Sequence, residues 1–130
     1  MQDSKRIEKH LKIYREELSQ PEEQYAPLVQ RAMGCMQGYL FDEELTVQWM
    51  KETCYIDEKN FAARFRKCVG RYPKEYVLYH RMEAGKILLQ QTNATVTRIA
   101  LALGFTSHSA FCKTFKKKTG LRPSEWREQN

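Results

Sequence analysis

The chain reads FRKCVGRYPKEY over Phe65–Tyr76 and FKKKTGLRPSEW over Phe115–Trp126, fifty residues later. In both stretches a phenylalanine, a basic pair, a glycine, a proline, a glutamate and a closing aromatic residue recur at the same spacing. The match extends upstream, where Phe61 pairs with Phe111 at the same offset. So many coincidences at one offset indicate a duplicated structural unit.

The second copy, TRIALALGFTSHSAFCKTFKKKTG, predicts two short helices joined by a tight turn. Gly104 can adopt the positive φ that ends a helix, and Ser107 is placed to cap the next one. Phe111 and Phe115, four residues apart, mark the buried face of that second helix. This pattern is typical of a helix-turn-helix. The opposite, outward face would carry His108, Ser109, Cys112, Lys113 and Lys116.

The rest of the chain predicts an all-α fold, because apolar residues recur at helical spacing and alternating patterns are rare. An amphipathic N-terminal helix with the stripe Ile7, Leu11, Tyr14 and Leu18 should end at Gln20-Pro21, and packing within the chain is favoured over a dimer seam for it. Thr46, Asp57 and Thr95 are expected helix caps, like Ser107. We expect a first helix-turn-helix at about 46–68 with its second helix from about 58, a linker helix at about 73–91, a second helix-turn-helix at about 96–118, and a last helix from Pro123.

Charge is divided unevenly along the chain. Residues 1–44 hold 6 Lys or Arg and 9 Asp or Glu, a net of −3, whereas residues 45–130 hold 16 and 7, a net of +9. A positive charge concentrated in one part of a protein indicates a polyanionic partner. The predicted linker helix would span roughly 27 Å, which with the widths of its neighbours approaches the ~34 Å between successive major grooves of B-DNA. Two adjacent grooves could therefore be filled by one chain.

Other classes of protein find little support. No apolar run is long enough to cross a membrane, and the N-terminus lacks a secretory signal pattern. The four cysteines, Cys35, Cys54, Cys68 and Cys112, form no CxxC pair, so we expect reduced thiols and neither a metal site nor a cofactor. No nucleophile elbow, phosphate loop or HExxH motif indicates an enzyme. The alternative left open is a protein-interaction module whose basic face docks an acidic partner.

These residues closely resemble the AraC/XylS-type DNA-binding domain of bacterial transcription regulators over residues 27–130, with residues 1–26 as an N-terminal helix or linker. The strongest part runs from Arg81 to Arg127, through Ile99-Ala100, Gly104-Phe105 and Phe115-Lys116. The resemblance implies two helix-turn-helix subdomains joined by a long helix. It also implies a cytoplasmic, nucleoid-associated regulator, either an activator or a repressor, that binds promoter DNA and contacts RNA polymerase. Monomer binding is expected, with a dimer possible through the N-terminal helix or a missing domain.

Carried over by position, the resemblance assigns DNA contacts to both copies. The first recognition helix would present Glu58, Lys59, Ala62, Ala63 and Arg66, and the second His108, Ser109, Cys112 and Lys113, with Lys116 and Lys117 near phosphates. Departures from the family pattern fall mainly in the first copy. Met50 stands where a small alanine is usual and Cys54 where glycine is frequent, and Gly85 replaces an alanine in the linker helix.

Overall fold

A computed structural model describes residues 2–56 and 59–129 of the chain. Within these residues all regular structure is helical, which confirms the all-α prediction. In chain order the helices are α1 (Gln2–Glu16), α2 (Pro27–Gly38), α3 (Val47–Thr53), α4 (Phe61–Val69), α5 (Pro73–Gln91), α6 (Val96–Ala102), α7 (His108–Thr119) and α8 (Pro123–Gln129).

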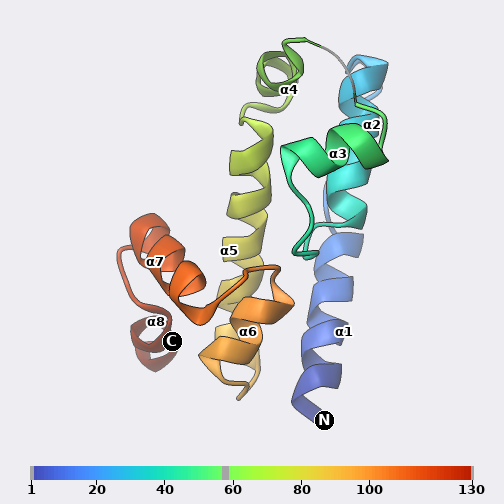
Figure 1. The fold of residues 1–130 in the computed structure, drawn as a ribbon. Coiled ribbons are helices and arrows are strands. Elements are labelled where there is room, and N and C mark those ends of the chain that lie inside the picture. Colours follow the sequence, from blue (N-terminus) through green and yellow to red (C-terminus); the bar gives the residue numbers. More distant parts are fainter. Residues whose placement is uncertain (1, 57–58, 130) are drawn as a thin grey trace.

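Helix α5 is the spine of the molecule (Figure 1). α1, α6 and α8 pack against it, while α2 packs against α3 and α4. The first helix-turn-helix, α3–α4, therefore lies at the N-terminal end of α5, and the second, α6–α7, lies beside its C-terminal half (Figure 1). The two predicted units and the linker helix between them are confirmed.

The duplicated sequence corresponds to a duplicated packing motif. Phe61, Phe65, Phe111 and Phe115 are all fully buried or nearly so. The ring of Phe65 meets Tyr76 edge to face, with ring centroids 5.7 Å apart and planes at 82°. Phe115 meets Trp126 in the same way, at 5.9 Å and 81°. The aromatic residues that open and close each quoted stretch therefore hold α4 against α5 and α7 against α8.

The side-chain caps expected at the starts of α3, α6 and α7 are present. The hydroxyls of Thr46, Thr95 and Ser107 each accept a hydrogen bond from the backbone amide three residues later, at 3.0, 3.1 and 3.1 Å. The start expected for α4 is wrong. That helix begins only at Phe61, because Asn60 adopts the left-handed conformation at φ 66° and interrupts it. The cap expected at Asp57 lies outside the described residues.

The structure also corrects the alignment of the two copies. In the first helix of each unit the offset is 49 rather than fifty, since Thr46 corresponds to Thr95 and the buried Met50 to the buried Ile99. Both helices end in the same turn. The amide of Ile56 donates to the carbonyl of Lys51, and that of Phe105 to Ala100, each at 3.1 Å, as in a Schellman motif.

This alignment removes two of the departures expected in the first copy. Met50 is the counterpart of Ile99, so it fills an ordinary core position rather than a site that requires alanine. The positive-φ residue matching Gly104, at 97°, is Tyr55, at 58°, and not Cys54. Cys54 instead corresponds to Leu103. The offset returns to fifty in α4 and α7 because the turn of the first unit is one residue shorter.

The N-terminal helix docks on its own chain. Ile7 and Leu11 are buried where α1 packs on α5. The Tyr14 hydroxyl lies 2.7 Å from His80 Nδ1 on α5. The apolar stripe is thus used within the chain, as expected for a docked helix.

The expectation that the four cysteines are reduced is wrong for two of them. Cys35 on α2 and Cys54 after α3 form a disulfide, with Cα atoms 6.3 Å apart, while Cys68 and Cys112 are free thiols. Sequence spacing could not reveal this pair, because 19 residues separate the two cysteines and only the packing of α3 beside α2 brings them together.

Candidate nucleic-acid interface

Helix α7 presents a basic outward face. His108, Ser109 and Lys113 are exposed along its first two turns, and Lys116 and Lys117 continue the same face toward its end. Cys112 lies among them but is only partly exposed. The helix contains no acidic residue. The structure therefore brings all of the residues predicted for the second recognition helix onto one surface.

Helix α4 presents a shorter version of that face. Ala62, Ala63 and Arg66 are exposed as predicted, and so is Lys67, which the site prediction omitted although the repeat pairs it with Lys117. Lys59 is also exposed, but it lies in the turn before α4 rather than on the helix. Glu58 lies outside the described residues. No acidic residue occurs within α4 either.

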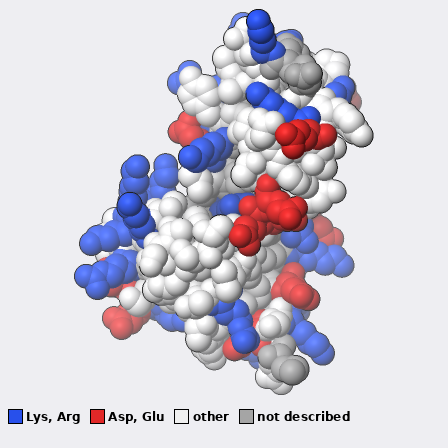
Figure 2. Space-filling view, viewed as in Figure 1, with Lys and Arg blue, Asp and Glu red and all other residues white. Residues whose placement is uncertain are grey.

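Basic side chains are concentrated around these helices. Figure 2 shows Lys and Arg side chains gathered on the side of the molecule where α7 lies in Figure 1. On the first unit, the guanidinium of Arg66 lies over the ring of Tyr72 at 5.1 Å from its centroid. Arg71 lies over Tyr79 at 4.0 Å. These aromatic contacts steady the two guanidinium groups while leaving them at the surface.

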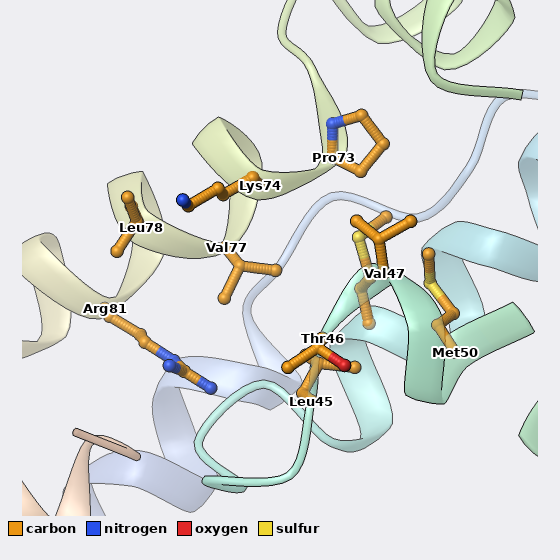
Figure 3. A pocket seen from close by; sticks show the side chains of 10 residues that line it. Leu45, Thr46, Val47, Met50, Pro73, Lys74, Val77, Leu78 and Arg81 are labelled. Carbon is orange, nitrogen blue, oxygen red and sulfur yellow. The ribbon is translucent and has the colours of Figure 1, made fainter. Parts of the chain in front are cut away.

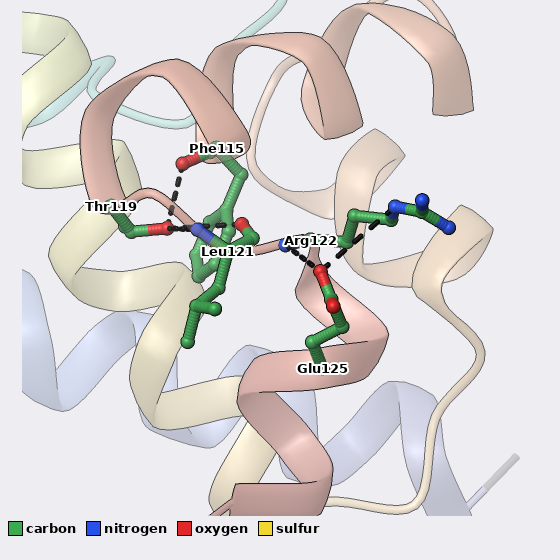
Figure 4. A network of polar contacts seen from close by, with 5 residues as sticks. All are labelled: Phe115, Thr119, Leu121, Arg122 and Glu125. Atoms are coloured by element: carbon green, nitrogen blue, oxygen red, sulfur yellow. Dashed lines mark hydrogen bonds and ion pairs between the residues drawn. The ribbon is translucent and has the colours of Figure 1, made fainter.

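The end of α7 is fixed by a small polar network (Figure 4). The Thr119 hydroxyl lies 2.8 Å from the carbonyl of Phe115 and accepts a hydrogen bond from the amide of Leu121 at 3.2 Å. The amide of the next residue, Arg122, donates a hydrogen bond to the Glu125 carboxylate at 2.9 Å, and this contact caps the start of α8. The network holds the turn that follows the lysines of α7.

His108 and Cys112 lie one turn apart on α7, with Cys112 Sγ 3.6 Å from His108 Nε2. Burial raises the pKa of the Cys112 thiol, so this sulfur is protonated and uncharged at neutral pH. It can offer a weak donor and an apolar surface, but no negative charge. In the part of the chain that is described, no three His, Cys, Asp or Glu side chains are grouped so that they could hold a metal ion.

A buried arginine that sequence reasoning did not assign holds the turn of the second unit against the loop after α2. Arg81 on α5 is 7% exposed, and its guanidinium donates to the carbonyls of Leu40 at 2.9 Å and Asp42 at 2.8 Å. A third, longer contact of 3.5 Å reaches the carbonyl of Gly104. Arg81 therefore joins the linker helix, the loop after α2 and the turn of the second unit. Arg81 opens the segment that carries the family resemblance, and this position was the only hint in the sequence. Its contacts with main-chain carbonyls depend on how the helices pack and could not be predicted.

Arg127 also binds main-chain carbonyls, at the C-terminal end of α5. Its guanidinium donates to the carbonyls of Leu89 at 2.9 Å and Thr92 at 3.2 Å. Carbonyls at the end of a helix have no partner within the helix, so a cation there both satisfies them and complements the helix dipole. α8 thereby anchors the end of α5 nearest the second unit.

A groove separates α3 from α5 (Figure 3). Its volume is about 350 Å³, and its walls are mainly apolar. Val47 and Met50 line it from α3, and Val77 points toward them from α5 (Figure 3). Leu78 of α5 also lines the groove. Helix α3 is therefore not closely packed against α5 along this groove.

No helix in the described ranges is long and apolar enough to cross a lipid bilayer.

Comparison with known proteins identifies the fold. A family described as "Helix-turn-helix domain" matches residues 52–129. An uncharacterized HTH-type transcriptional regulator of Bacillus subtilis, YobQ, is 33% identical over 96 residues, or 74% of this chain and 39% of that protein. A putative AraC-like transcription regulator of Streptomyces lividans is 32% identical over 102 residues, which are 78% of this chain and 33% of that protein.

Among solved structures, the DNA-binding domain of AdpA, a global transcriptional factor solved in complex with a target DNA, superimposes with a TM-score of 0.70. The match covers 80% of this chain and 93% of that domain at 21% identity, and at this low identity it shows that the fold is shared and nothing more. The chain spans 39% and 33% of the length of the two curated relatives. The family match over residues 52–129 and the identity to an AraC-like regulator agree with two helix-turn-helix units joined by α5, and the chain belongs to the AraC-type helix-turn-helix family.

Proposed function

We propose that this chain is a sequence-specific double-stranded DNA-binding transcription regulator that places α4 and α7 in adjacent major-groove segments of promoter DNA. The observation that carries the proposal is the pair of acid-free helices with basic outward faces, one at the N-terminal end and one beside the C-terminal half of a single 19-residue helix. At 1.5 Å per residue α5 is about 28 Å long, close to one turn of B-DNA once the flanking helices are added.

Position along each helix divides the proposed contacts. In helix-turn-helix proteins the N-terminal part of the recognition helix reads base edges. His108, Ser109, Cys112 and Lys113 are the proposed readers in the second unit. Lys116 and Lys117 lie nearer the end of the helix, where they are suited to hold phosphates, as Arg66 is in the first unit.

The first unit should read fewer bases. Ala62 and Ala63 carry no hydrogen-bonding group and can offer only their methyl groups, which suit the methyl of thymine. Lys59 precedes the helix, and Asn60 shortens the end that would enter the groove. We propose that the first unit contributes more to affinity than to selectivity.

The wider biology follows the same proposal. Residues 27–130 would form the DNA-binding domain and residues 1–26 an extension docked on α5. RNA polymerase is the proposed partner at promoters, and the bacterial cytoplasm the proposed location. Binding as a monomer is favoured, because the apolar residues of α1 are already buried against α5. The proposed role is binding, with no catalytic step.

The test starts from DNA selected out of a random pool by the purified chain. Footprinting of the selected site should show two protected major-groove segments about 10 bp apart, and binding should survive excess non-specific DNA. A protein-interaction module with an acidic partner would instead bind all DNA equally and lose it to the competitor. That result would reject the proposed function.

A further inference from the structure

The disulfide occupies a position that the second unit fills with an apolar side chain. Cys54 is the counterpart of Leu103, which is 0% exposed. Leu103 packs into the core below the turn, whereas Cys54 is only partly buried and is bonded to Cys35 on α2. The first unit therefore holds its turn by a covalent bond where the second holds it by hydrophobic packing.

Helix α3 is less deeply buried than its counterpart α6, although Val47 and Trp49 also pack against the core. Among its own residues only Met50 is buried, whereas α6 buries both Ile99 and Ala100. On the side toward α5, α3 faces the open groove of Figure 3 rather than a packed helix. Trp49 meets Tyr39 edge to face at 4.9 Å, near the end of α2. The bond to Cys35 is thus a principal tether of this short helix.

The surroundings of the disulfide suit attack by a thiol. Cys54 is partly exposed, and Tyr55 beside it is 79% exposed, so this end of the disulfide lies near the surface. Arg31 precedes Cys35 by one turn on α2, and its guanidinium donates to the carbonyl of Tyr55 at 3.2 Å. A cation in this position stabilises the thiolate that forms when the bond breaks.

We propose that Cys35 and Cys54 are a reversible thiol–disulfide pair that fixes the first helix-turn-helix unit to α2 when oxidised and frees it when reduced. A thiolate of a dithiol reductant attacks Cys54 Sγ, the S–S bond breaks, and Cys35 leaves as a thiolate and takes up a proton. The second thiol of the reductant then displaces Cys54 as a thiol, and the reductant departs as a disulfide. A small-molecule disulfide reverses both steps and restores the bond.

The consequence for DNA rests on the proposed function. Release of α3 loosens the turn that leads into α4, while the second unit keeps its packed turn with Leu103. The oxidised protein should therefore protect two groove segments, and the reduced protein only the segment that α7 contacts. Specificity would change less than affinity, because α7 carries most of the proposed base readers.

The first experiment needs no DNA. The full chain is equilibrated in buffers with graded ratios of glutathione to glutathione disulfide, quenched with acid, and alkylated with a maleimide before intact-mass analysis. We expect two alkylated thiols, Cys68 and Cys112, in oxidising buffer and four after reduction. Amide exchange over residues 47–56 should then become about a hundredfold faster, from the loss of a bond that closes a loop of this size.

Two matched variants separate this pair from the other cysteines. Cys68→Ser with Cys112→Ser should keep the full redox response. Cys35→Ala with Cys54→Leu copies the packing of Leu103, so it should protect two groove segments in both buffers. Footprints of these variants and of the parent chain in oxidising and reducing buffer complete the test.

Each outcome decides the proposal. Four alkylated thiols in oxidising buffer would overturn it, and so would a reduced chain with unchanged exchange over residues 47–56. A redox response that survives in the Cys35→Ala and Cys54→Leu variant would assign the effect to other cysteines and also overturn it. Absence of DNA binding in both buffers would reject the proposed function, while alkylation and exchange would still decide whether the pair is a redox site.

Discussion

Replacement of Gly104 by alanine should destabilise the protein through two separate effects. The residue has φ +97°, a region that costs an L-amino acid about 1–2 kcal/mol. A Cβ at this position would also lie 2.8 Å from Arg81 Nη2, closer than real Cβ atoms approach, and 3.0 Å from the carbonyl oxygen of Phe41, which is a tight contact. The guanidinium of Arg81 must then move away from the carbonyl of Asp42.

The second effect can be given a size. Arg81 is buried, so its guanidinium would be left without a hydrogen-bond partner, which costs about 1–3 kcal/mol, and the two effects together should lower the free energy of unfolding by about 2–5 kcal/mol. Gly120→Ala is the matched control, because Gly120 has φ +85° and open space around the position of its Cβ. That variant should lose only the backbone cost of about 1–2 kcal/mol.

Urea denaturation followed by circular dichroism measures both variants against the parent chain. The m-value should stay constant, since neither change alters how much surface unfolding exposes. If Gly104→Ala loses no more stability than Gly120→Ala, the contact between Arg81 and the turn does not matter, and the reasoning is refuted.

Three further predictions concern base reading, the turn of the first unit and pH. Lys113→Ala should relax the preferred base at one position at a cost of about 1–3 kcal/mol, whereas Lys117→Ala should weaken all sequences alike and lower the salt slope by about one unit. Site selection with salt titrations measures this, and unchanged selection by Lys113→Ala would contradict it. Tyr55→Gly should raise the free energy of unfolding by about 0.5–1 kcal/mol, because the exposed side chain gives up a left-handed conformation; a loss of stability in urea would disprove it. Burial lowers the pKa of His80; the charge of Arg71 lowers it further, and that of Glu83 raises it. The unfolded state therefore binds more protons than the folded state, so the free energy of unfolding should fall as the pH drops below about 6.5. His80→Gln should flatten that slope in urea melts at several pH values, and an unchanged slope would assign it to other groups.

Local signals in the sequence predicted most of the helical framework. Thr95, Ser107, Pro73 and Gly104 act through the backbone of the next few residues, so their effects can be read without knowledge of the fold. The repeat then supplied the long-range arrangement, because two copies of one unit must pack alike. The phenylalanines and the closing aromatics illustrate this in both units.

One error could have been avoided from the sequence. A uniform offset of fifty placed Cys54 opposite Gly104, although the expected caps Thr46 and Thr95 lie 49 residues apart. The other errors depend on three-dimensional neighbours. The partner of Cys54 became evident only from the packing of α3 against α2. The role of Arg81 was equally hidden, because it binds main-chain carbonyls, which every residue possesses.

Gly85 gives the linker helix a property that its composition alone would not suggest. A glycine in mid-helix could act as a hinge, but a Cβ at this one would lie 3.2 Å from Leu103 and 3.5 Å from Phe111, so the second unit sits directly on it. On the proposed mode of binding, the second recognition helix then keeps a fixed place on α5, and while the disulfide tethers the first unit the distance between the two helices is set by the protein. Any misfit with the pitch of the double helix must be absorbed by bending of the DNA, whose stiffness depends on its sequence. Base pairs between the two contacted segments, touched by neither helix, would thereby contribute to the choice of site.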